Sequence, residues 1–545
     1  MRRGVRIGLV LGVVSAVLGS VWVVADHASR PPAALLYSTF LGGADMDFAH
    51  AIEVDASGNA YVVGVTWSRD FPISSDAFDS ERGKNTDAFV ARFDSDGRLG
   101  WATYLGGDGY DSADTVAIDE ARNVYVAGTT GSSDFPVTPD AFDATFNSEP
   151  YEDDVFLAKF DADGRLTYST FLGGSGEDGS IYGNLGPTAL AVDEVGSVYL
   201  VGGTDSPDFP WTSGAYSSYG GGTDAFVVKF DVTGRSLEYA ARIGGRGGDQ
   251  ADSVAVDSAG NAFVVGTAAD GEFPVTPGSF DTTFNGYDDA FLARVDSTGS
   301  RLTFCTFLGG GGDESVAGVA LGPLGDAFVA GTTDSRDFLA TATAYDPSLG
   351  GYSDAFVIRV APQGDRIRYS TLIGGSGREF AQSLRVDGAG RAHVVGSTWS
   401  SDFPASLGAF PTAHEGLGGV QDGFLATLDP WGSRLSYATF LGGNGEDWIS
   451  AVSVDDAGGA RLAGGTFSHG FPVTRSAFAP RLGGSADAFI AQLSLTPAPA
   501  PDNLLPTVVA TAAGIAVAGA AWIFAGRRRR TDAARTATVA PLRPQ

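Results

Sequence analysis

The scarcity of some residues in this sequence, and the absence of certain motifs, exclude several kinds of site. Its 545 residues include one cysteine, Cys305, which excludes an intrachain disulfide framework and a site built on a Cys-x-x-Cys pair. The 35 lysines and arginines face 65 acidic residues, a formal net charge of −30. Such an acidic surface repels phosphates, so nucleic acid is not expected as a partner. The five histidines are scattered, and neither HExxH nor GxSxG occurs.

Glycine and apolar residues are abundant instead. Glycine contributes 77 residues, hydrophobic residues make up 43% and aromatic residues 11%. A disordered chain lacks this much apolar material to bury. The glycines follow no three-residue period, which excludes collagen. The sequence therefore predicts a large folded protein of β type.

The N-terminal segment has the pattern of an export signal. Three arginines among the first six residues precede an apolar run over residues 7–25. A positive start followed by an apolar run is typical of a signal peptide, and 19 apolar residues are also just enough to span a bilayer. We therefore predict a signal peptide or an uncleaved N-terminal anchor over residues 1–30.

The C-terminal segment has the pattern of a membrane anchor. Residues 504–526 are almost entirely apolar, and four arginines follow at once. This arrangement predicts a transmembrane helix, with residues 527–545 as a basic cytoplasmic tail. A Pro-rich linker, residues 496–503, precedes the helix. We expect a protein of the cell membrane whose main body faces outside and whose C-terminus is cytoplasmic.

A unit of 64 to 71 residues recurs seven times between residues 35 and 495. Each unit has four alternating apolar runs separated by Gly, Asn and Asp, which is typical of antiparallel strands. Four strands repeated seven times predict an all-β fold, a seven-bladed β-propeller of four-stranded antiparallel blades. A solenoid would need atypical capping repeats, and none occurs. The marker of each unit is Leu or Ile before Gly-Gly, at Leu41, Leu105, Leu172, Ile243, Leu308, Ile373 and Leu441.

The two ends of the repeat region predict how the ring closes. Residues 36–41 form a strand of the fourth type without three predecessors, and residues 487–493 form a strand of the third type without a successor. We expect the N-terminal strand to complete the last blade. Such closure removes two exposed sheet edges that would otherwise pair with other chains.

Several motifs carry a family resemblance. They are the segment at 168–174 (YSTFLGG), the turn at 256–261 (VDSAGN), the triplet at 402–404 (DFP) and the strand start at 354–357 (DAFV). Together these motifs resemble the SBBP (seven-bladed β-propeller) repeat of microbial surface proteins, over roughly residues 35–495. The resemblance implies a propeller on an exported or surface-attached protein, and it implies no catalytic activity.

Acidic residues recur at four places of the unit. Six residues after the marker lie Asp47, Asp111, Asp178, Asp249, Glu314, Glu379 and Asp447. Before the third strand lie Asp87, Asp154, Asp224, Asp289, Asp354, Asp422 and Asp487. Before Phe-Pro lie Asp70, Asp134, Asp208, Glu272, Asp337 and Asp402, and at the end of the first strand lie Asp55, Asp119, Asp193, Asp257, Asp387 and Asp455. Because Asp side chains bond nearby backbone N–H groups, we interpret most of these acids as turn and loop caps.

Calcium is the alternative use of these acids. It prefers six to eight oxygen ligands, and the first three series should share one face of the ring because connections alternate between faces in a meander. The seven acids six residues after the marker are therefore candidate calcium ligands. No other cofactor is expected.

Extra residues interrupt the repetition on that same face. They lie around Ser180, Tyr182 and Asn184 in the third unit, near Tyr151 in the second and near His414 in the sixth. Binding sites tend to lie on loops held by a rigid scaffold, so these five residues are candidate ligand contacts. Neutral insertion at loop tips is the alternative. Recurring aromatic residues are expected to pack between blades, and Cys305 to be a small buried hydrophobe.

The function that these features favour is a non-catalytic binding or structural module of the cell surface, anchored by the C-terminal helix. Its partner would be a surface glycan or a protein. A calcium-stabilised spacer is one alternative. A polysaccharide lyase or hydrolase is another, and it would need unlike acid, base and aromatic groups from different blades on one face. In such an enzyme His50 or Asp178 would be essential for turnover.

Overall fold

The computed structural model describes residues 35–149, 152–179, 188–406, 409, 414, 419–455 and 458–495. The compact unit that contains them runs from residue 32 to residue 496. The predicted signal or anchor at 1–30, the linker at 496–503, the membrane helix at 504–526 and the tail at 527–545 lie outside the described residues. Within the described ranges, no helix is long and apolar enough to cross a membrane.

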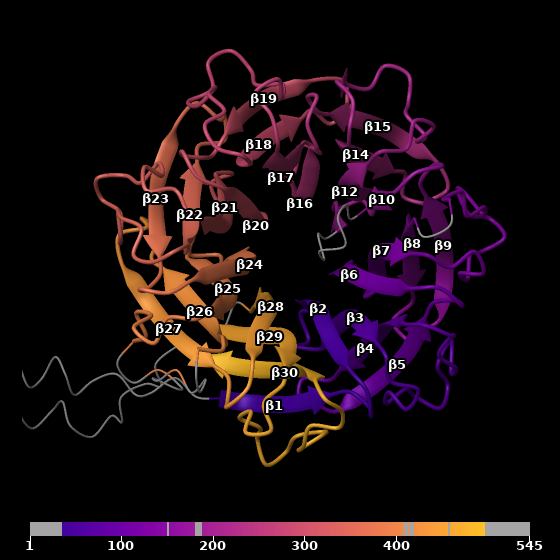
Figure 1. Cartoon of the computed structure of the whole chain (residues 1–545). Helices are drawn as coiled ribbons and strands as arrows, with labels where there is room; N and C mark the ends of the chain where they lie inside the picture. Colours follow the sequence, from indigo (N-terminus) through magenta and orange to yellow (C-terminus); the bar gives the residue numbers. More distant parts are fainter. Residues whose placement is uncertain are drawn as a thin grey trace, which may run out of the picture. The chain divides into compact units, whose positions relative to one another are not determined.

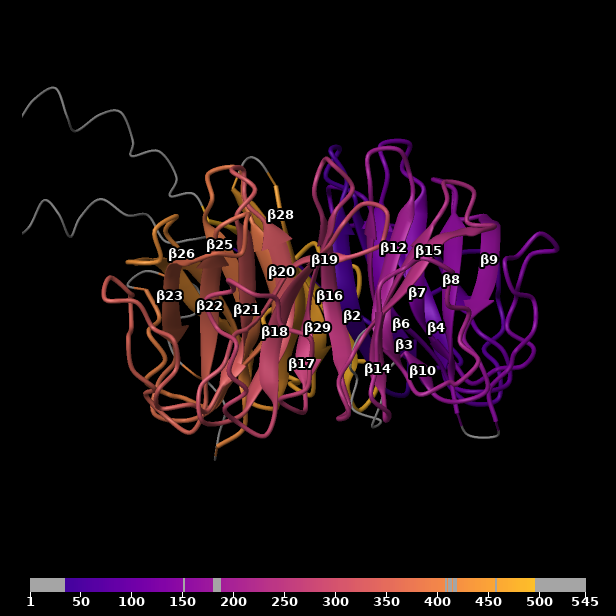
Figure 2. The same cartoon turned by 90° about the horizontal axis from the view of Figure 1, so that it is seen from above.

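Seven antiparallel sheets surround a central axis, which confirms the predicted propeller (Figure 1). We number the blades along the chain: blade 1 is β2–β5, blade 2 is β6–β9, blade 3 is β10–β15, blade 4 is β16–β19, blade 5 is β20–β23, blade 6 is β24–β27, and blade 7 is β28–β30 with β1. In the perpendicular view of Figure 2 the strands run between two faces, where the loops gather.

Every blade has the same strand order from the axis to the rim (Figure 1). The innermost strands are β2 (Asp47–Val54), β6 (Asp111–Ile118), β10 (Asp178–Gly179) with β11 (Ala189–Val192), β16 (Gln250–Val256), β20 (Glu314–Leu321), β24 (Glu379–Val386) and β28 (Asp447–Val454). The second strands are β3 (Ala60–Thr66), β7 (Val124–Thr130), β12 (Val198–Thr204), β17 (Ala262–Ala268), β21 (Ala327–Thr333), β25 (Ala392–Thr398) and β29 (Gly459–Thr466).

The third and outer strands complete each blade. The third strands are β4 (Asp87–Phe93), β8 (Asp154–Phe160), β14 (Asp224–Phe230), β18 (Asp289–Val295), β22 (Asp354–Val360), β26 (Asp422–Leu428) and β30 (Asp487–Ser494). The outer strands are β5 (Leu99–Leu105), β9 (Leu166–Leu172), β15 (Leu237–Ile243), β19 (Leu302–Phe307), β23 (Ile367–Ile373), β27 (Leu435–Leu441) and β1 (Leu35–Leu41). A short strand, β13 (Ser217–Ser218), pairs in parallel with β15.

The N-terminal strand closes the ring as the sequence predicts. β1 pairs antiparallel with β30, with Thr39 opposite Ile490 and Leu41 opposite Ala488. The indigo β1 and the yellow β30 lie side by side in Figure 1. The last blade therefore joins the two ends of the described chain and pairs the outer edge of β30.

A β-bulge marks the start of the inner strand in blades 1, 2, 4, 5, 6 and 7. In blade 1 the pairing register shifts between Ala49 and Ala51, opposite Gly64 on the second strand. A Cβ atom at Gly64 would lie 1.9 Å from the carbonyl oxygen of Phe48, so only glycine fits this close backbone approach. The bulge adds local twist where the inner strand leaves the face that carries the long loops.

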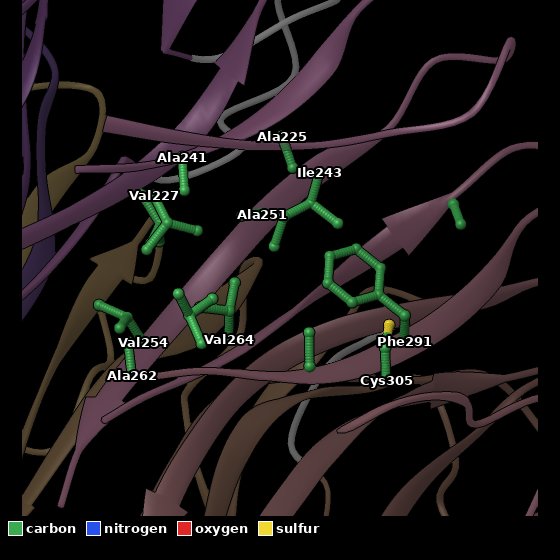
Figure 3. Packing of buried hydrophobic residues seen from close by; sticks show 14 of the residues in the cluster. Ala225, Val227, Ala241, Ile243, Ala251, Val254, Ala262, Val264, Phe291 and Cys305 are labelled. Carbon is green, nitrogen blue, oxygen red and sulfur yellow. The ribbon is translucent and has the colours of Figure 1, made fainter. Parts of the chain in front are cut away.

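The hydrophobic cores lie between neighbouring blades. Figure 3 shows the core of blades 3 and 4, where Val227 and Ile243 meet Val264 and Phe291. Cys305 is fully buried there, as expected, and burial raises the pKa of its thiol. The Phe before Pro packs against a third-strand Phe, as with Phe71 and Phe89, whose ring centroids lie 4.6 Å apart at a tilt of 31°. These recurring aromatic residues are therefore packing residues, as predicted.

Candidate binding site at the axial mouth

The seven acids six residues after the marker begin the inner strands or directly precede them, and all are buried, with at most 1% of their surface exposed. We call them the acid girdle. In blade 1 the carboxylate of Asp47 accepts hydrogen bonds from the Gly43 N–H at 2.8 Å, the Ser68 hydroxyl at 2.8 Å and the Thr66 hydroxyl. The same three donors recur around the carboxylates of Asp111 and Glu314.

The Thr-x-Ser pair that completes this arrangement was not recognised from the sequence. It stands at the end of the second strand in six units, from Thr66 and Ser68 in blade 1 to Thr466 and Ser468 in blade 7. Blade 4 has Ala268 and Asp270 at these positions, and Asp249 accepts a hydrogen bond from the Ala269 N–H at 3.2 Å there. The fixed spacing of Thr-x-Ser from the Phe-Pro motif is the signal that could have revealed it.

An acid that begins a third strand lies close to a girdle acid, and the first glycine of the marker lies against both carboxyl groups. A Cβ atom at Gly106 would lie 2.7 Å from an Asp111 oxygen and 2.9 Å from the Asp87 carboxyl carbon. Burial is the main cause that raises the pKa of Asp111 to about 6 and that of Asp87 to about 7. A buried carboxyl group of blade 1 and one of blade 2 therefore meet over a residue that has to be glycine.

This geometry does not favour calcium at the girdle. Backbone N–H and hydroxyl groups already donate to the carboxylate oxygens that a cation would need. In the part of the chain that the structure describes, no group of three or more His, Cys, Asp or Glu residues is placed to hold a metal ion. Calcium at Asp47, Asp111, Asp178, Asp249, Glu314, Glu379 or Asp447 stays a prediction.

The other two acid series cap loops and turns. Asp55 accepts hydrogen bonds from the N–H groups of Ser57 and Asn59 at 2.8 and 2.9 Å, and Asp70 accepts one from the Ala44 N–H at 2.9 Å. In blade 4 the acid before Phe-Pro is Glu272, but the equivalent loop bond, from the Arg246 N–H at 2.7 Å, goes to Asp270, the acid at the Ser position of Thr-x-Ser. The Glu272 carboxylate lies 3.0 Å from the Arg246 Nε instead.

Of the five candidate ligand contacts, Ser180, Tyr182, Asn184 and Tyr151 lie outside the described residues. The fifth, His414, is described, and only 6% of its side chain is exposed. Its ring meets Phe440 edge-on at 5.7 Å, and its Nδ1 lies 3.9 Å from an Asp422 carboxylate oxygen. His414 therefore packs into blade 6, an orientation that does not favour a direct ligand contact.

A cavity of about 560 Å³ lies on the axis, at the face that carries the long loops. Its wall is formed by the inner strands of blades 1, 2, 5, 6 and 7 together with adjoining loop residues. Phe48, Trp448 and Phe467 supply aromatic rings. His50, Asp114 and Glu446 supply charged or titratable groups from three different blades. We call this space the axial cavity.

The aromatic rings occupy two repeat positions, and only in three consecutive blades. The positions are the residue after each girdle acid and the central residue of Thr-x-Ser. Blades 6, 7 and 1 have Phe380 and Trp399, Trp448 and Phe467, and Phe48 and Trp67. Blades 2 to 5 have Ser112 and Gly131, Gly179 and Asp205, Gln250 and Ala269, and Ser315 and Asp334. We call the six aromatic residues the aromatic mouth.

The rings of the aromatic mouth are inclined to one another. The Phe48 ring centroid lies 5.2 Å from that of Trp448 at 55°, and 5.8 Å from that of Trp67 at 69°. Trp448 and Phe467 are 6.0 Å apart at 43°. Phe467 is 37% exposed. Inclined rings of this kind wall a concave space rather than forming one flat platform.

The acid and base groups of the axial cavity are partly engaged with one another. The His50 Nδ1 lies 3.2 Å from the Ala113 carbonyl oxygen and 3.7 Å from an Asp114 carboxylate oxygen. The Ser112 hydroxyl donates to Asp114 at 2.8 Å. The His50 Nε2 is buried and has no hydrogen-bond partner among the described residues. Glu446 stands at the exposed rim of the cavity.

A second cleft, of about 780 Å³, lies beside the axial cavity over blades 4 to 6. Its wall includes Asp288, Asp313 and Asp334, and a single arginine, Arg378. The Arg378 guanidinium lies 5.6 Å from the centre of the Tyr352 ring, a cation–π distance. The wall of this cleft therefore carries more acidic than basic side chains, and Tyr352 and Phe380 add aromatic rings to it.

Comparison with known proteins identifies the repeat. The family model described as SBBP, beta-propeller repeat, matches residues 100–136, 238–274 and 368–404. The chain carries SBBP repeats. Each matched segment begins near the start of an outer strand and ends at the Phe-Pro region of the next blade. An SBBP repeat thus spans the marker, the girdle acid and both positions of the aromatic mouth.

Relatives of this SBBP-repeat chain are distant. The regulatory protein FlaEY of Caulobacter vibrioides is 26% identical over 345 residues, which are 58% of this chain and 33% of that protein. The chain thus spans about a third of the length of that curated relative. BamB of Moraxella catarrhalis has 12% identity and a TM-score of 0.35, covering 82% of this chain and 86% of that chain. A PL25 ulvan lyase has 9% identity and a TM-score of 0.42, covering 79% and 92%.

Proposed function

We propose that this protein is a non-catalytic binding module of the cell surface, which holds its ligand at the axial mouth of the propeller. The observation that carries the proposal is the restriction of the aromatic mouth to blades 6, 7 and 1. The ring needs only the residues that recur in its blades. Of these rings, Phe48, Trp448 and Phe467 from blades 1 and 7 line the axial cavity and offer a large, rigid contact area for a ligand.

The same proposal places the propeller outside the cell, attached through residues 504–526. Its support is the pair of apolar, arginine-flanked segments at the two ends of the sequence. Because the one native cysteine, Cys305, is fully buried, a thiol reagent should label only a cysteine introduced at the surface, and such a cysteine can report membrane topology. On intact cells a membrane-impermeant maleimide should label Ser95→Cys in the propeller and not Ala533→Cys in the tail. The opposite pattern would contradict the orientation.

Binding itself is tested by the thermal unfolding of the detergent-solubilised full chain. The panel consists of small organic cations, neutral oligosaccharides and acidic oligosaccharides, tested on the wild type and on Trp448→Ala. A ligand at a hundredfold excess over its Kd stabilises the protein by about 2.7 kcal/mol. We expect at least one class to raise the Tm of the wild type and not that of the variant. No shift with any class would contradict the binding role.

A second candidate, a polysaccharide-acting enzyme, is favoured by one observation. The axial cavity brings His50, Asp114 and Glu446 together from blades 1, 2 and 7, beside aromatic rings. Against this, the His50 Nε2 is buried and its Nδ1 faces a carbonyl oxygen, so the ring is poorly placed as a general base. The Asp178 carboxylate is fully buried and accepts hydrogen bonds from the Gly174 N–H and the Ser206 hydroxyl, so it is also poorly placed to meet a substrate. Turnover of a polysaccharide that is lost in His50→Ala would support the enzyme, whereas a wild type that binds a polysaccharide without turning it over would support the binding module.

A further inference from the structure

We propose that the ligand of the axial mouth carries a positively charged alkylammonium group, which sits among Phe48, Trp448 and Phe467 and is neutralised by Glu446. This inference rests on the binding function proposed above and names the chemical class of the ligand. It uses the ring geometry, the charges of the cavity wall and the charge of the whole molecule, each of which is an independent observation.

The ring geometry suits a cation better than a sugar. The faces of aromatic rings carry partial negative charge and attract a cation within about 6 Å of the ring centre. Phe48 lies 5.2 Å from Trp448 and 6.2 Å from Phe467, with ring planes inclined by 55° and 50°. Rings inclined in this way can present several faces to one compact charge. A sugar ring, in contrast, stacks along a single flat face.

The wall of the axial cavity carries negative charge that the protein does not fully compensate. Among its described lining residues, Asp114 and Glu446 are acidic and none is lysine or arginine. Asp114 has partners within the cavity wall, since it accepts the Ser112 hydroxyl proton and lies 3.7 Å from His50. Glu446 is exposed, and no ion pair within the described ranges joins it to a basic side chain. Glu446 is therefore the carboxylate that a cationic ligand would meet.

The wider surface favours the same class of ligand. The formal net charge is −30, and the neighbouring cleft adds Asp288, Asp313 and Asp334 beside the axial cavity. A field of this sign concentrates cations near the face and repels acidic polymers. The cavity volume of about 560 Å³ lies in the range of small-molecule sites, and an alkylammonium group with its substituents fits within it.

The test uses choline and its neutral carbon isostere, 3,3-dimethyl-1-butanol, which have the same shape and differ in charge. Each is titrated into the detergent-solubilised full chain, and binding is followed by tryptophan fluorescence and by calorimetry. We expect choline to bind at least tenfold more tightly than the isostere. The affinity should fall at least tenfold in Trp448→Ala and several-fold in Glu446→Gln. The control Glu194→Gln, an exposed acid of the β11–β12 hairpin, should bind as the wild type does.

Three outcomes would overturn the inference. Equal binding of choline and the isostere would show that charge is not recognised. Wild-type affinity in Glu446→Gln and Trp448→Ala would place the cation elsewhere. If a neutral oligosaccharide bound in a Trp448-dependent manner and choline did not, the cationic class would be wrong and the binding function would stand. The failure of the inference is thus distinguishable from the failure of the proposed function.

Discussion

The acid girdle and the aromatic mouth are formed by neighbouring residues, yet they differ in almost every property. Asp447 points into its blade, where the Gly443 N–H and the Ser468 hydroxyl donate to it, whereas Trp448 lines the axial cavity. Successive side chains of a strand point to opposite sides, so one residue can serve architecture and the next can serve binding. The girdle acid occurs in all seven blades and the aromatic pair in three. Residues that recur in all seven blades show how the ring is built. Residues that occur in only three blades indicate where a ligand would be held.

The largest effect on stability is expected from crowding the girdle. In Gly106→Ala the new methyl group would lie within 3 Å of both the Asp111 and the Asp87 carboxyl groups. Overpacking of this kind should lower the free energy of unfolding by about 3 kcal/mol. The matched control is Gly388→Ala, where nothing lies within 4 Å and the change should be within about 0.5 kcal/mol. Urea unfolding measures both variants, and equal stabilities would contradict the girdle geometry.

The pH dependence of stability tests the girdle as a whole. Burial raises the pKa of Asp47 to about 6 and that of Asp178 to about 7, above the value of about 3.9 for an unfolded chain. The folded state therefore binds these protons more tightly than the unfolded state does. Their contribution to stability is greatest below about pH 4, falls as the pH rises, and reaches its full penalty above about pH 7.

We therefore expect a higher free energy of unfolding at about pH 5 than at about pH 8. Hairpin acids such as Asp387, whose pKa is lowered by its hydrogen bonds from His393 and Arg391 and by the Arg391 charge, act in the opposite sense only at lower pH. Repeating the urea titrations in about 0.5 M salt screens surface repulsion and leaves the effect of burial. Greater stability at about pH 8 in both salts would contradict the raised pKa values.

Blade 4 allows the girdle to be improved. Its Ala268 and Asp270 stand where the other six blades have Thr and Ser, so the Asp249 carboxylate lacks those two hydroxyl donors. The single substitution Ala268→Thr, which leaves the Asp270 bond from the Arg246 N–H in place, should raise the free energy of unfolding by about 1 kcal/mol, the net value of a well-formed hydrogen bond. Thermal unfolding beside the wild type measures the gain. A variant less stable than the wild type would contradict the role assigned to the Thr of Thr-x-Ser.

Calcium should have the smallest effect. Because the girdle carboxylates already accept hydrogen bonds from N–H and hydroxyl groups, millimolar calcium should leave the Tm of the full chain unchanged relative to chelator. The aromatic mouth should be equally insensitive, since choline affinity is expected to be the same with and without calcium. A clear upward shift in Tm would make the girdle a metal site and would favour the calcium-stabilised spacer.

Most of the fold could be predicted from the sequence because the repeat supplies seven copies of the same signal. The seven blades of four strands follow from the seven repeated units, and the closure by the N-terminal strand follows from the unmatched strands at the two ends. The buried roles of Cys305 and of the Phe before Pro were also predictable, since Cys305 stands in a strand of the fourth type and this Phe recurs at the same place in the units. Repetition made these inferences secure.

The candidate site could not be predicted in the same way, because the units were aligned on what they share. Phe48, Phe380 and Trp448 stand directly after the girdle acids, a position where the other four units have Ser, Gly or Gln. A comparison of the seven units for their differences would have found this position. The extra loop residues of the sixth unit made His414 a candidate contact, but its side chain packs into blade 6 against Phe440. The other four loop candidates lie outside the described residues, so they stay a prediction beside these strand positions.

The most direct test of the account is the choline affinity of one mouth variant and one girdle variant, measured side by side. Trp448→Ala should bind choline at least tenfold more weakly and lose about 1 kcal/mol of stability, because its ring is only partly buried. Asp111→Ala should lose about 3 kcal/mol by leaving three buried donors unpaired, and where folded it should bind choline within about threefold of the wild type. If Trp448→Ala bound choline as the wild type does, the mouth would not be the binding site and the account would be contradicted.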